Sequence, residues 1–407
     1  MKLMKKLMMM AMMLVASAAA FAGDSPALKE ILKQKSYADA EALVQSSLSQ
    51  LASDAEKAKA YNKLVDLAYE AFMAQSTIIT ENQLNKQMGK EEKPVDEQLM
   101  SEMAYKAIIA AADCDKYDQL PNEKGKVAPK FAAKNAQRLW SNVRNQLVNA
   151  GQEALQAKDN AKARMYWQLF TESDKFPLFK DCDREAQKPF FGQVARYAAI
   201  FAYQDKDFAK ALELADIAMQ DPEEYENAIN LKMEILGADL KTRDDSLSYI
   251  NKLKELYAEH KTNGIMEKLY NMLGAIGEKA AADKILDDAL AADPNNFVAL
   301  ADKGMNLLND DPAEASKYLR RAFEIKNDNA LLATYLATSL SMQAQNTEDS
   351  AAKKALYKEA IGFFDKAKEL DPERLQANWG YNRYNAYYNY YGEDAPETKQ
   401  AEADYKY

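Results

Sequence analysis

The residues that could perform catalysis or bind a metal are few in this chain of 407 residues. His260 is the only histidine, so the sequence offers neither a histidine-based zinc site nor a dyad with a serine or cysteine. Cys114 and Cys182 each lie in an Asp-Cys-Asp triplet, where flanking carboxylates disfavour the reactive thiolate. Phosphate-loop, nucleophile-elbow and zinc-protease motifs are absent from the sequence. We predict a protein that is not an enzyme and uses no cofactor, and we rank a carboxylate-based hydrolase last.

A cluster of aspartates at Asp113, Asp115 and Asp118 has the composition of the start of a calcium-binding loop. Counted from Asp113, however, Asp118 stands where the loop requires glycine, and Lys124 stands where it requires a bidentate glutamate. Residues 115–129 contain Pro, Gly and Asn, which are typical of connections. We therefore predict a plain connecting loop there and no metal site.

The segment 376–392, QANWGYNRYNAYYNYYG, has an unusual aromatic content. One face of a helix cannot bury so many rings, so some must be exposed even if the segment caps the preceding helices. Exposed Tyr and Trp suit the recognition of a peptide, or stacking on a sugar. The residues that we predict to pack are Tyr381, Tyr384 and Tyr388. The residues that we predict to contact a partner are Trp379, Tyr387 and Tyr390.

The elements that must position these residues are helices. The chain has only 13 Gly and 11 Pro and is rich in Ala, Leu, Lys and Glu, which favour helix almost throughout. Ala282, Leu286 and Ala289 lie at i, i+4 and i+7, so they share one helix face. Pro294 then ends this helix. The same small–large–small pattern returns as Ala315-Leu319-Ala322 and as Ala360-Phe364-Ala367.

Small residues at these positions let facing helices approach to roughly 8–9 Å, while the large residue fills the space beside them. Tyr249, Ala282 and Ala315 hold the leading position of the pattern and follow one another at intervals of 33 residues. A regular interval of this length indicates stacked helix pairs. We predict buried packing roles without ligand contacts for Gly151, Ala163, Ala211, Ala282, Ala289, Gly304, Ala315, Ala322, Ala360 and Ala367.

Leu300-Gly304-Leu307 followed by Ala315-Leu319-Ala322 resembles the two-helix pattern of the tetratricopeptide repeat (TPR) family. Leu147-Gly151-Ala154 with Ala163-Trp167-Phe170 is a further match. The resemblance covers the chain from about residue 130 to residue 391. It implies an all-α, right-handed superhelical solenoid of about eight helix–turn–helix pairs plus a C-terminal capping helix. It also implies a non-enzymatic scaffold that binds proteins or peptides.

Some TPR proteins bind a C-terminal carboxylate with lysine and asparagine side chains on the first helix of each pair. The positions in this chain that look equivalent are Glu267 with Asn271, Ala301 with Met305, and Thr334 with Thr338. The lysines are missing from all three pairs. Recognition of a C-terminal carboxylate by these first-helix positions is therefore disfavoured.

The first 22 residues have the features of a secretory signal peptide. Lys2, Lys5 and Lys6 precede an uncharged apolar stretch, and Ala20-Phe21-Ala22 is a small-x-small cleavage site. We predict cleavage near Ala22 and a periplasmic or secreted protein. No cysteine stands at the cleavage site, so we do not expect a lipoprotein. An oxidising compartment would permit a disulfide between the two cysteines, and the sequence leaves this open.

These features divide the chain into four predicted regions: the signal peptide 1–22, irregular helical repeats with insertions at 23–129, a TPR-like solenoid with its capping helix at 130–392, and a flexible tail at 393–407. The polar segment 75–94 is one exposed insertion. The net charge of −10 argues against nucleic acid and anionic membranes as partners, and no segment after the signal peptide is long enough to span a membrane. We expect another protein or an extended peptide as partner. Glycan binding through the C-terminal aromatics is the alternative.

Overall fold

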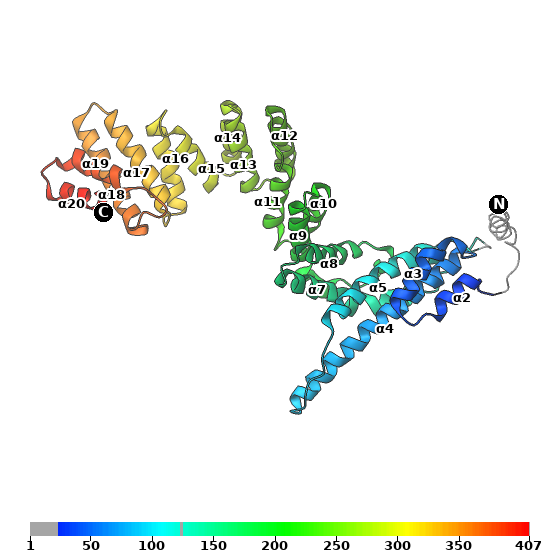
Figure 1. Ribbon diagram of the computed structural model, residues 1–407. Coiled ribbons are helices and arrows are strands. Elements are labelled where there is room, and N and C mark those ends of the chain that lie inside the picture. The colour runs from blue at the N-terminus through cyan, green and yellow to red at the C-terminus, as the bar shows by residue number, and fades with distance from the viewer. Residues whose placement is uncertain (1–22, 123–124, 407) are drawn as a thin grey trace, which may run out of the picture. The chain divides into compact units, whose positions relative to one another are not determined.

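A computed structural model of the chain describes residues 23–122 and 125–406 (Figure 1). The secondary structure of these residues is helical and contains no strand, which confirms the predicted all-α class. The predicted signal peptide lies outside the described residues. None of the helices in the described ranges is long and apolar enough to cross a membrane. The chain divides after Ile235 into two compact units, each with its own core.

Consecutive helices of the N-terminal unit pack side by side: α4 packs on α5, α7 on α8, and α9 on α10. A π-helical turn at Leu139–Val143 joins α6 to α7. The helices are α2 (Pro26–Lys33), α3 (Tyr37–Ser47), α4 (Asp54–Gln87), α5 (Glu97–Asp118), α6 (Ala132–Arg138), α7 (Arg144–Gln156), α8 (Asn160–Ser173), α9 (Lys188–Gln204), α10 (Phe208–Ala218) and α11 (Tyr225–Leu236).

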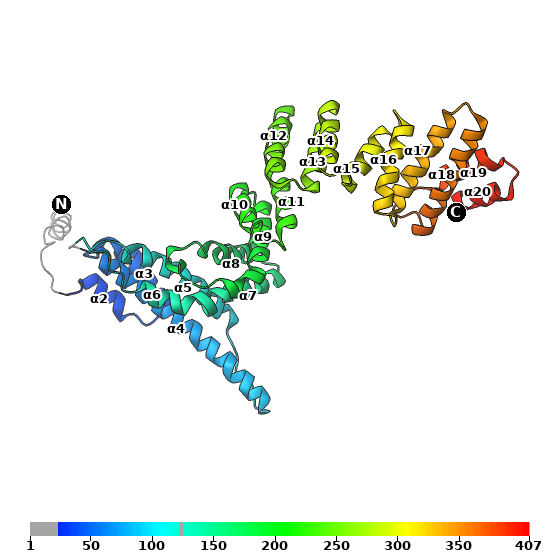
Figure 2. The ribbon, with the colours of Figure 1, turned by 180° about the vertical axis from the view of Figure 1, so that it is seen from behind.

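The C-terminal unit is a succession of helices in which each packs on the next, as Figures 1 and 2 both show. This is the stacked arrangement that the repeated small–large–small pattern predicts. The helices are α12 (Arg243–His260), α13 (Asn263–Ala275), α14 (Lys279–Ala292), α15 (Phe297–Leu307), α16 (Pro312–Ile325), α17 (Ala330–Gln345), α18 (Ser350–Leu370), α19 (Gly380–Tyr391) and α20 (Pro396–Lys406).

The predicted repeat positions lie inside the helix stack. All ten of them, from Gly151 to Ala367, are buried. Gly151 lies against the indole of Trp167, and Gly304 lies against Leu319 of the facing helix. A Cβ atom at Gly304 would stand 2.6 Å from Leu319 Cγ and 3.1 Å from its backbone nitrogen. These contacts are the close helix approach that small residues make feasible.

Short polar side chains start most helices of both units. Asp311, for example, accepts a hydrogen bond from the backbone N–H of Glu314, and Asp349 accepts one from that of Ala352. Thr242 and Asp245 form a capping box at the start of α12. Each such bond pairs a backbone donor that has no partner within its own helix, and it typically stabilises the helix by about 1 kcal/mol.

Helix α4 extends further than the sequence predicts. Residues 75–87 are helical and not an irregular insertion, and both views show this end of α4 projecting from the other helices of the unit. The returning segment is tied to α4 by Asn82, whose amide donates to Lys93 O and accepts from Lys93 N, both at 2.7 Å. Asp96 N also donates to Gln75 Oε1 at 2.8 Å. An exposed helix needs no apolar periodicity, so the spacing of apolar residues does not predict a helix here.

The predicted flexible tail after Gly392 is corrected by the structure, because residues 396–406 form helix α20. Thr398 and Ala401 are buried against α19. The Asp404 carboxylate accepts hydrogen bonds from Lys368 Nζ at 2.6 Å and from Arg383 at 2.9 Å. Two small buried residues and one ion-paired acid are a weak signal in a polar sequence, so composition suggests a tail where a packed helix exists.

A fully buried arginine fixes the irregular connection between α8 and α9. Arg144 Nε donates to Ser173 Oγ at 2.9 Å, and its Nη2 donates to Phe170 O at 2.7 Å. Its Nη1 donates to Gln187, and its guanidinium lies over the Trp140 ring at 4.4 Å. Burial lowers the pKa of Arg144 to about 9, which leaves it charged at neutral pH. Buried charge is tolerated because every face of the guanidinium has a partner.

The close contact at Gly304 leads to a stability prediction. Gly304→Ala should lower the free energy of unfolding by ~1–3 kcal/mol, because the new methyl group overlaps Leu319. Gly362→Ala is the matched control. Gly362 lies inside α18, and apart from the adjacent backbone of its own helix no atom lies within 4 Å of the new methyl group. The free energy of unfolding of this variant should therefore rise by about 0.5–1 kcal/mol. Chemical denaturation of both variants provides the measurement. Equal effects at the two sites would contradict the packing argument.

Candidate binding surface on the C-terminal helices

The predicted partner-binding residue Trp379 lies in the protein core. Its side chain is 1% exposed, and its indole Nε1 donates to Asp371 O at 2.8 Å. The Asp371 carboxylate in turn accepts the backbone N–H groups of Leu375, Gln376 and Ala377. These bonds build the turn between α18 and α19, and α19 begins at Gly380. Trp379 is a packing residue, and its assignment to partner binding is corrected.

Tyr387 is also buried, and it belongs to a polar network between helices. Its hydroxyl donates to Asp365 Oδ2 at 2.9 Å, and Arg383 Nε donates to Asp365 Oδ1 at 2.8 Å. Arg383 also bonds Asp404 of α20. Burial, followed by the Asp365 hydrogen bond, raises the pKa of Tyr387 to about 12. The network joins α18, α19 and α20, so the prediction that Tyr387 contacts a partner is also corrected.

Tyr390 is half-buried at the end of α19, where its ring lies edge-on to that of Tyr391 with centroids 4.6 Å apart. Its predicted contact with a partner stays a prediction. Tyr391, which is 47% exposed, stacks on the buried Tyr387 ring. These two rings therefore lie beside the polar network that fixes α19.

Two of the tyrosines that the sequence predicts to pack are exposed. Tyr381 is 52% exposed and Tyr388 is 41% exposed. Tyr381 and Tyr384 both contact the ring of Tyr405 from α20, at centroid distances of 5.3 and 6.5 Å, and Tyr384 contacts Tyr388 at 6.2 Å. We call this connected set of four rings, Tyr381, Tyr384, Tyr388 and Tyr405, the tyrosine surface.

The difference between the predicted and the observed burial of these tyrosines has a simple cause. The packing face of α19 consists of Gly380, Arg383, Ala386 and Tyr387. Arg383 looks like a solvent residue in the sequence, but its charge is neutralised by Asp365 and Asp404 inside the unit. If the most aromatic face of α19 is taken as its packing face, the side opposite to the true packing face is therefore chosen. The missed signal was the acidic residue Asp365 on α18, whose position opposite Arg383 no local pattern reveals.

The tyrosine surface has the properties of a recognition surface. Each ring offers apolar area and one hydroxyl that can donate or accept a hydrogen bond. Rings held by neighbouring rings lose little conformational entropy when a partner binds. The adjacent side chains on this side of α19 are also uncharged: Asn389 Nδ2 donates to Asn385 O at 2.7 Å. Charged residues of the following segment, Glu393, Glu402 and Lys406, lie near Tyr384, so they border the tyrosine surface.

The other chemical groups singled out by the sequence have structural roles. Both cysteines are free thiols, and Cys114 Sγ donates to Ala58 O at 3.3 Å. Burial raises the pKa of both thiols above its usual range, which disfavours the nucleophilic thiolate. Asp118 accepts the backbone N–H groups of Lys130, Phe131 and Ala132 and so starts α6. His260 Nε2 lies 3.6 Å from Glu259 Oε2. No group of three metal-ligating side chains occurs within the described ranges.

A carboxylate on α15 has an unfavourable environment. Asp302 Oδ2 is buried and has no hydrogen-bond partner in the described part of the chain. Burial, followed by repulsion from Glu267 on α13, raises the pKa of Asp302 to about 6. Glu267 is one of the positions where a carboxylate-binding TPR protein would carry lysine. This region of α13 and α15 is thus acidic and unsuited to a carboxylate partner.

Comparisons with known proteins give a limited result. No protein-family model matches the chain, and no curated protein matches it. Similar solved structures include the complex of the TPR2AB domain of yeast Sti1 with pHSP90, at 15% identity, covering 65% of this chain and 98% of that chain, with a TM-score of 0.21. The TPR domain of P58(IPK) is similar at 11% identity. This match covers 91% of this chain and 97% of that chain, with a TM-score of 0.25. At these values neither similarity decides the function.

The raised pKa of Asp302 gives a pH prediction. An unfolded aspartate titrates near ~3.9, so between pH ~4 and ~6 the native state binds more protons than the unfolded state. The free energy of unfolding should therefore fall as the pH rises through this window. Asp302→Asn should flatten the fall and make the protein more stable at pH 7. Urea unfolding at a series of pH values measures both effects, and an unchanged slope in Asp302→Asn would refute the assignment.

Proposed function

We propose that this chain is a non-enzymatic scaffold that binds another protein or an extended peptide, and that the tyrosine surface is a docking site. The observation that carries the proposal is the exposure of connected tyrosine rings on a helix whose opposite face is locked into the unit. Tyrosine is among the residues that contribute most to binding at protein interfaces. The chain offers these rings in a fixed arrangement.

Helix α19 provides a rigid support for this role. Asp365, Arg383 and Asp404 join it to both neighbouring helices, and Arg383 is only 7% exposed. A side chain on such a helix keeps its position without a partner, so less free energy is lost on binding. Stacked helix pairs of this kind resemble TPR proteins in the Gly304–Leu319 contact and its equivalents. We propose membership of that family on these residues.

The test uses exposed and buried aromatic residues of the same unit. Tyr381→Ala combined with Tyr388→Ala should weaken binding of a captured partner at least tenfold, as expected for central interface tyrosines. Each exposed substitution should change the free energy of unfolding by no more than roughly 0.5 kcal/mol. Trp379→Ala, by contrast, should cost ~3–5 kcal/mol because the indole is buried. Partners captured from envelope extracts would be identified, purified and titrated by calorimetry.

Leu375→Ala is the matched control, because Leu375 is 81% exposed in the same unit but does not belong to the tyrosine surface. Its affinity for the partner should equal that of the unsubstituted chain. Binding that survives the double tyrosine substitution would refute the docking site. Specific retention of a glycan on an array, without any protein partner, would instead favour the glycan-binding alternative.

We further propose that the chain is exported to the periplasm or cell envelope. Support comes from the N-terminal sequence of residues 1–22 and from the anchoring of the residues that follow it. Asp24 pairs with Lys59 at 2.5 Å, and Ser25 N donates to Glu56 Oε1 at 2.7 Å. These contacts are made by the residues that directly follow the proposed cleavage position. A chain cut near Ala22 would keep every one of these contacts.

Export is tested by fractionating bacterial cells that produce the chain. The envelope fraction should contain a protein whose N-terminal residue, determined by mass spectrometry, is Gly23. Leu14→Asp places a charge in the apolar stretch and should leave the uncleaved chain in the cytoplasm. A protein in the envelope fraction that still begins with Met1 would contradict the predicted cleavage near Ala22.

A further inference from the structure

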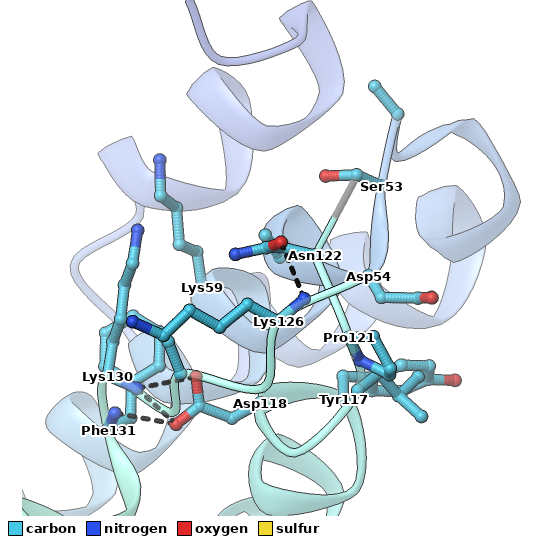
Figure 3. Close-up of a pocket in the computed structure, with 14 residues that line it drawn as sticks. Ser53, Asp54, Lys59, Tyr117, Asp118, Pro121, Asn122, Lys126, Lys130 and Phe131 are labelled. Atoms are coloured by element: carbon cyan, nitrogen blue, oxygen red, sulfur yellow. Dashed lines mark hydrogen bonds between the residues drawn. The ribbon is translucent and has the colours of Figure 1, made fainter. Parts of the chain in front are cut away.

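The N-terminal unit contains a pocket of about 680 Å³ that lies between the start of α4, the end of α5 and the segment leading to α6. Its size falls within the range of small-molecule sites. Its apolar wall includes Tyr117 and Pro121, while Phe131 lies beside Lys130 (Figure 3). The tyrosine surface belongs to the other unit, so this pocket is independent of the proposed docking site.

Three lysines line the same pocket. Figure 3 shows the side chains of Lys59, Lys126 and Lys130 extending along one side of it, with Tyr117 and Pro121 on the other. Lys59 pairs with Asp24 at 2.5 Å. No carboxylate of the described residues pairs with the ammonium group of Lys126 or of Lys130, whose side chains are exposed. The pocket therefore combines an apolar wall with two ammonium groups that have no counter-ion among the described residues.

The lining carboxylates do not neutralise these lysines. Asp54 pairs with Lys57 at 2.9 Å. Asp118 is turned toward the backbone, where it accepts the N–H groups of Lys130, Phe131 and Ala132 at 2.8, 2.7 and 3.2 Å. Both acids are thus engaged at the edge of the pocket. An incoming anion would meet cations without having to displace an ion pair between Lys126 or Lys130 and another described residue.

The backbone positions of both lysines are fixed. Asn122 N donates to Lys126 O at 3.0 Å, and Lys126 N donates to Asn122 Oδ1 at 3.2 Å. Lys130 N donates to the Asp118 carboxylate, which is itself 9% exposed. The bonds to Asn122 hold the backbone of Lys126, and the Asp118 carboxylate holds that of Lys130. Both lysines therefore keep their place in the pocket lining. Only the flexible ends of the side chains need to order around a ligand.

We propose that this pocket binds a small ligand in which an anionic group is attached to an apolar body. Lys126 and Lys130 pair with the anionic group, and Tyr117, Pro121 and Phe131 contact the apolar body. The pocket thus gives the N-terminal unit a binding function separate from partner docking. An anion alone or an apolar molecule alone meets only half of the site.

Three probes separate the two halves of the site: 1-naphthoate carries both groups, 1-naphthol lacks the charge, and acetate lacks the apolar body. The full chain should bind 1-naphthoate several-fold more tightly than either of the others in calorimetric titrations at low salt. Raising the salt concentration should weaken the binding of naphthoate and leave that of naphthol unchanged, because salt screens exposed charges.

Substitutions assign the charge recognition to two residues. Lys126→Gln with Lys130→Gln should lower the affinity for naphthoate roughly threefold to tenfold without changing that for naphthol. Lys35→Gln with Lys90→Gln is the matched control: it changes the net charge equally at exposed lysines outside the pocket and should have no effect. Both variants should melt at the temperature of the unsubstituted chain, since all four side chains are exposed.

Protection from chemical acylation provides a second measurement on the unsubstituted chain. Naphthoate should slow the acylation of Lys126 and Lys130, detected by peptide mass spectrometry, and leave Lys35 and Lys90 unaffected. Equal binding of naphthoate and naphthol, or undiminished naphthoate binding by the Lys126 and Lys130 variant, would overturn the proposal. Equal protection of all four lysines would overturn it as well.

Discussion

The close approach of facing helices at glycine and alanine positions is the constraint on which the helix stacks depend. Where Gly304 meets Leu319, one added carbon atom would overlap the neighbouring side chain and crowd its backbone nitrogen. Gly151 meets Trp167 in the same way in the other unit. At such short distances each helix pair is held in one orientation, because sliding or rotation would drive a large residue into a backbone. The small residues are buried in these contacts, so recognition of a partner must use other side chains.

Polar groups then decide which faces of the helices remain exposed. Asp365 draws Arg383 and Tyr387 into the unit, and this rotation leaves Tyr381 and Tyr388 facing solvent. Removing one member of such a network would leave a buried charge without a partner, which costs more than the loss of a surface ion pair. The same principle holds in the N-terminal unit, where the buried Arg144 determines the path of the connection to α9.

The sequence predicted what depends on local periodicity and missed what depends on distant charges. Helical class and buried positions such as Gly304 and Ala315 follow from spacing alone, since each helix must present small residues to its neighbour. The orientation of α19 could not be predicted in this way, because it depends on the distance between Arg383 and an acid on another helix. The projecting end of α4 was missed for a different reason: it buries almost nothing, so its side chains carry no pattern, and Asn82 holds it through backbone atoms.

Helix α20 has a consequence for the association of one molecule with another. Stacked helix arrays can in principle elongate, because the exposed side of the last helix can accept a further helix or another chain. The buried residues of α20 are Thr398 and Ala401, both directed to its own unit, while Glu397, Lys399 and Gln400 face solvent. End-to-end polymerisation through this face would bury charges and gain little apolar contact. The polar outer face of α20 thus disfavours the packing of another helix there, while the adjoining tyrosine rings stay exposed to a different molecule.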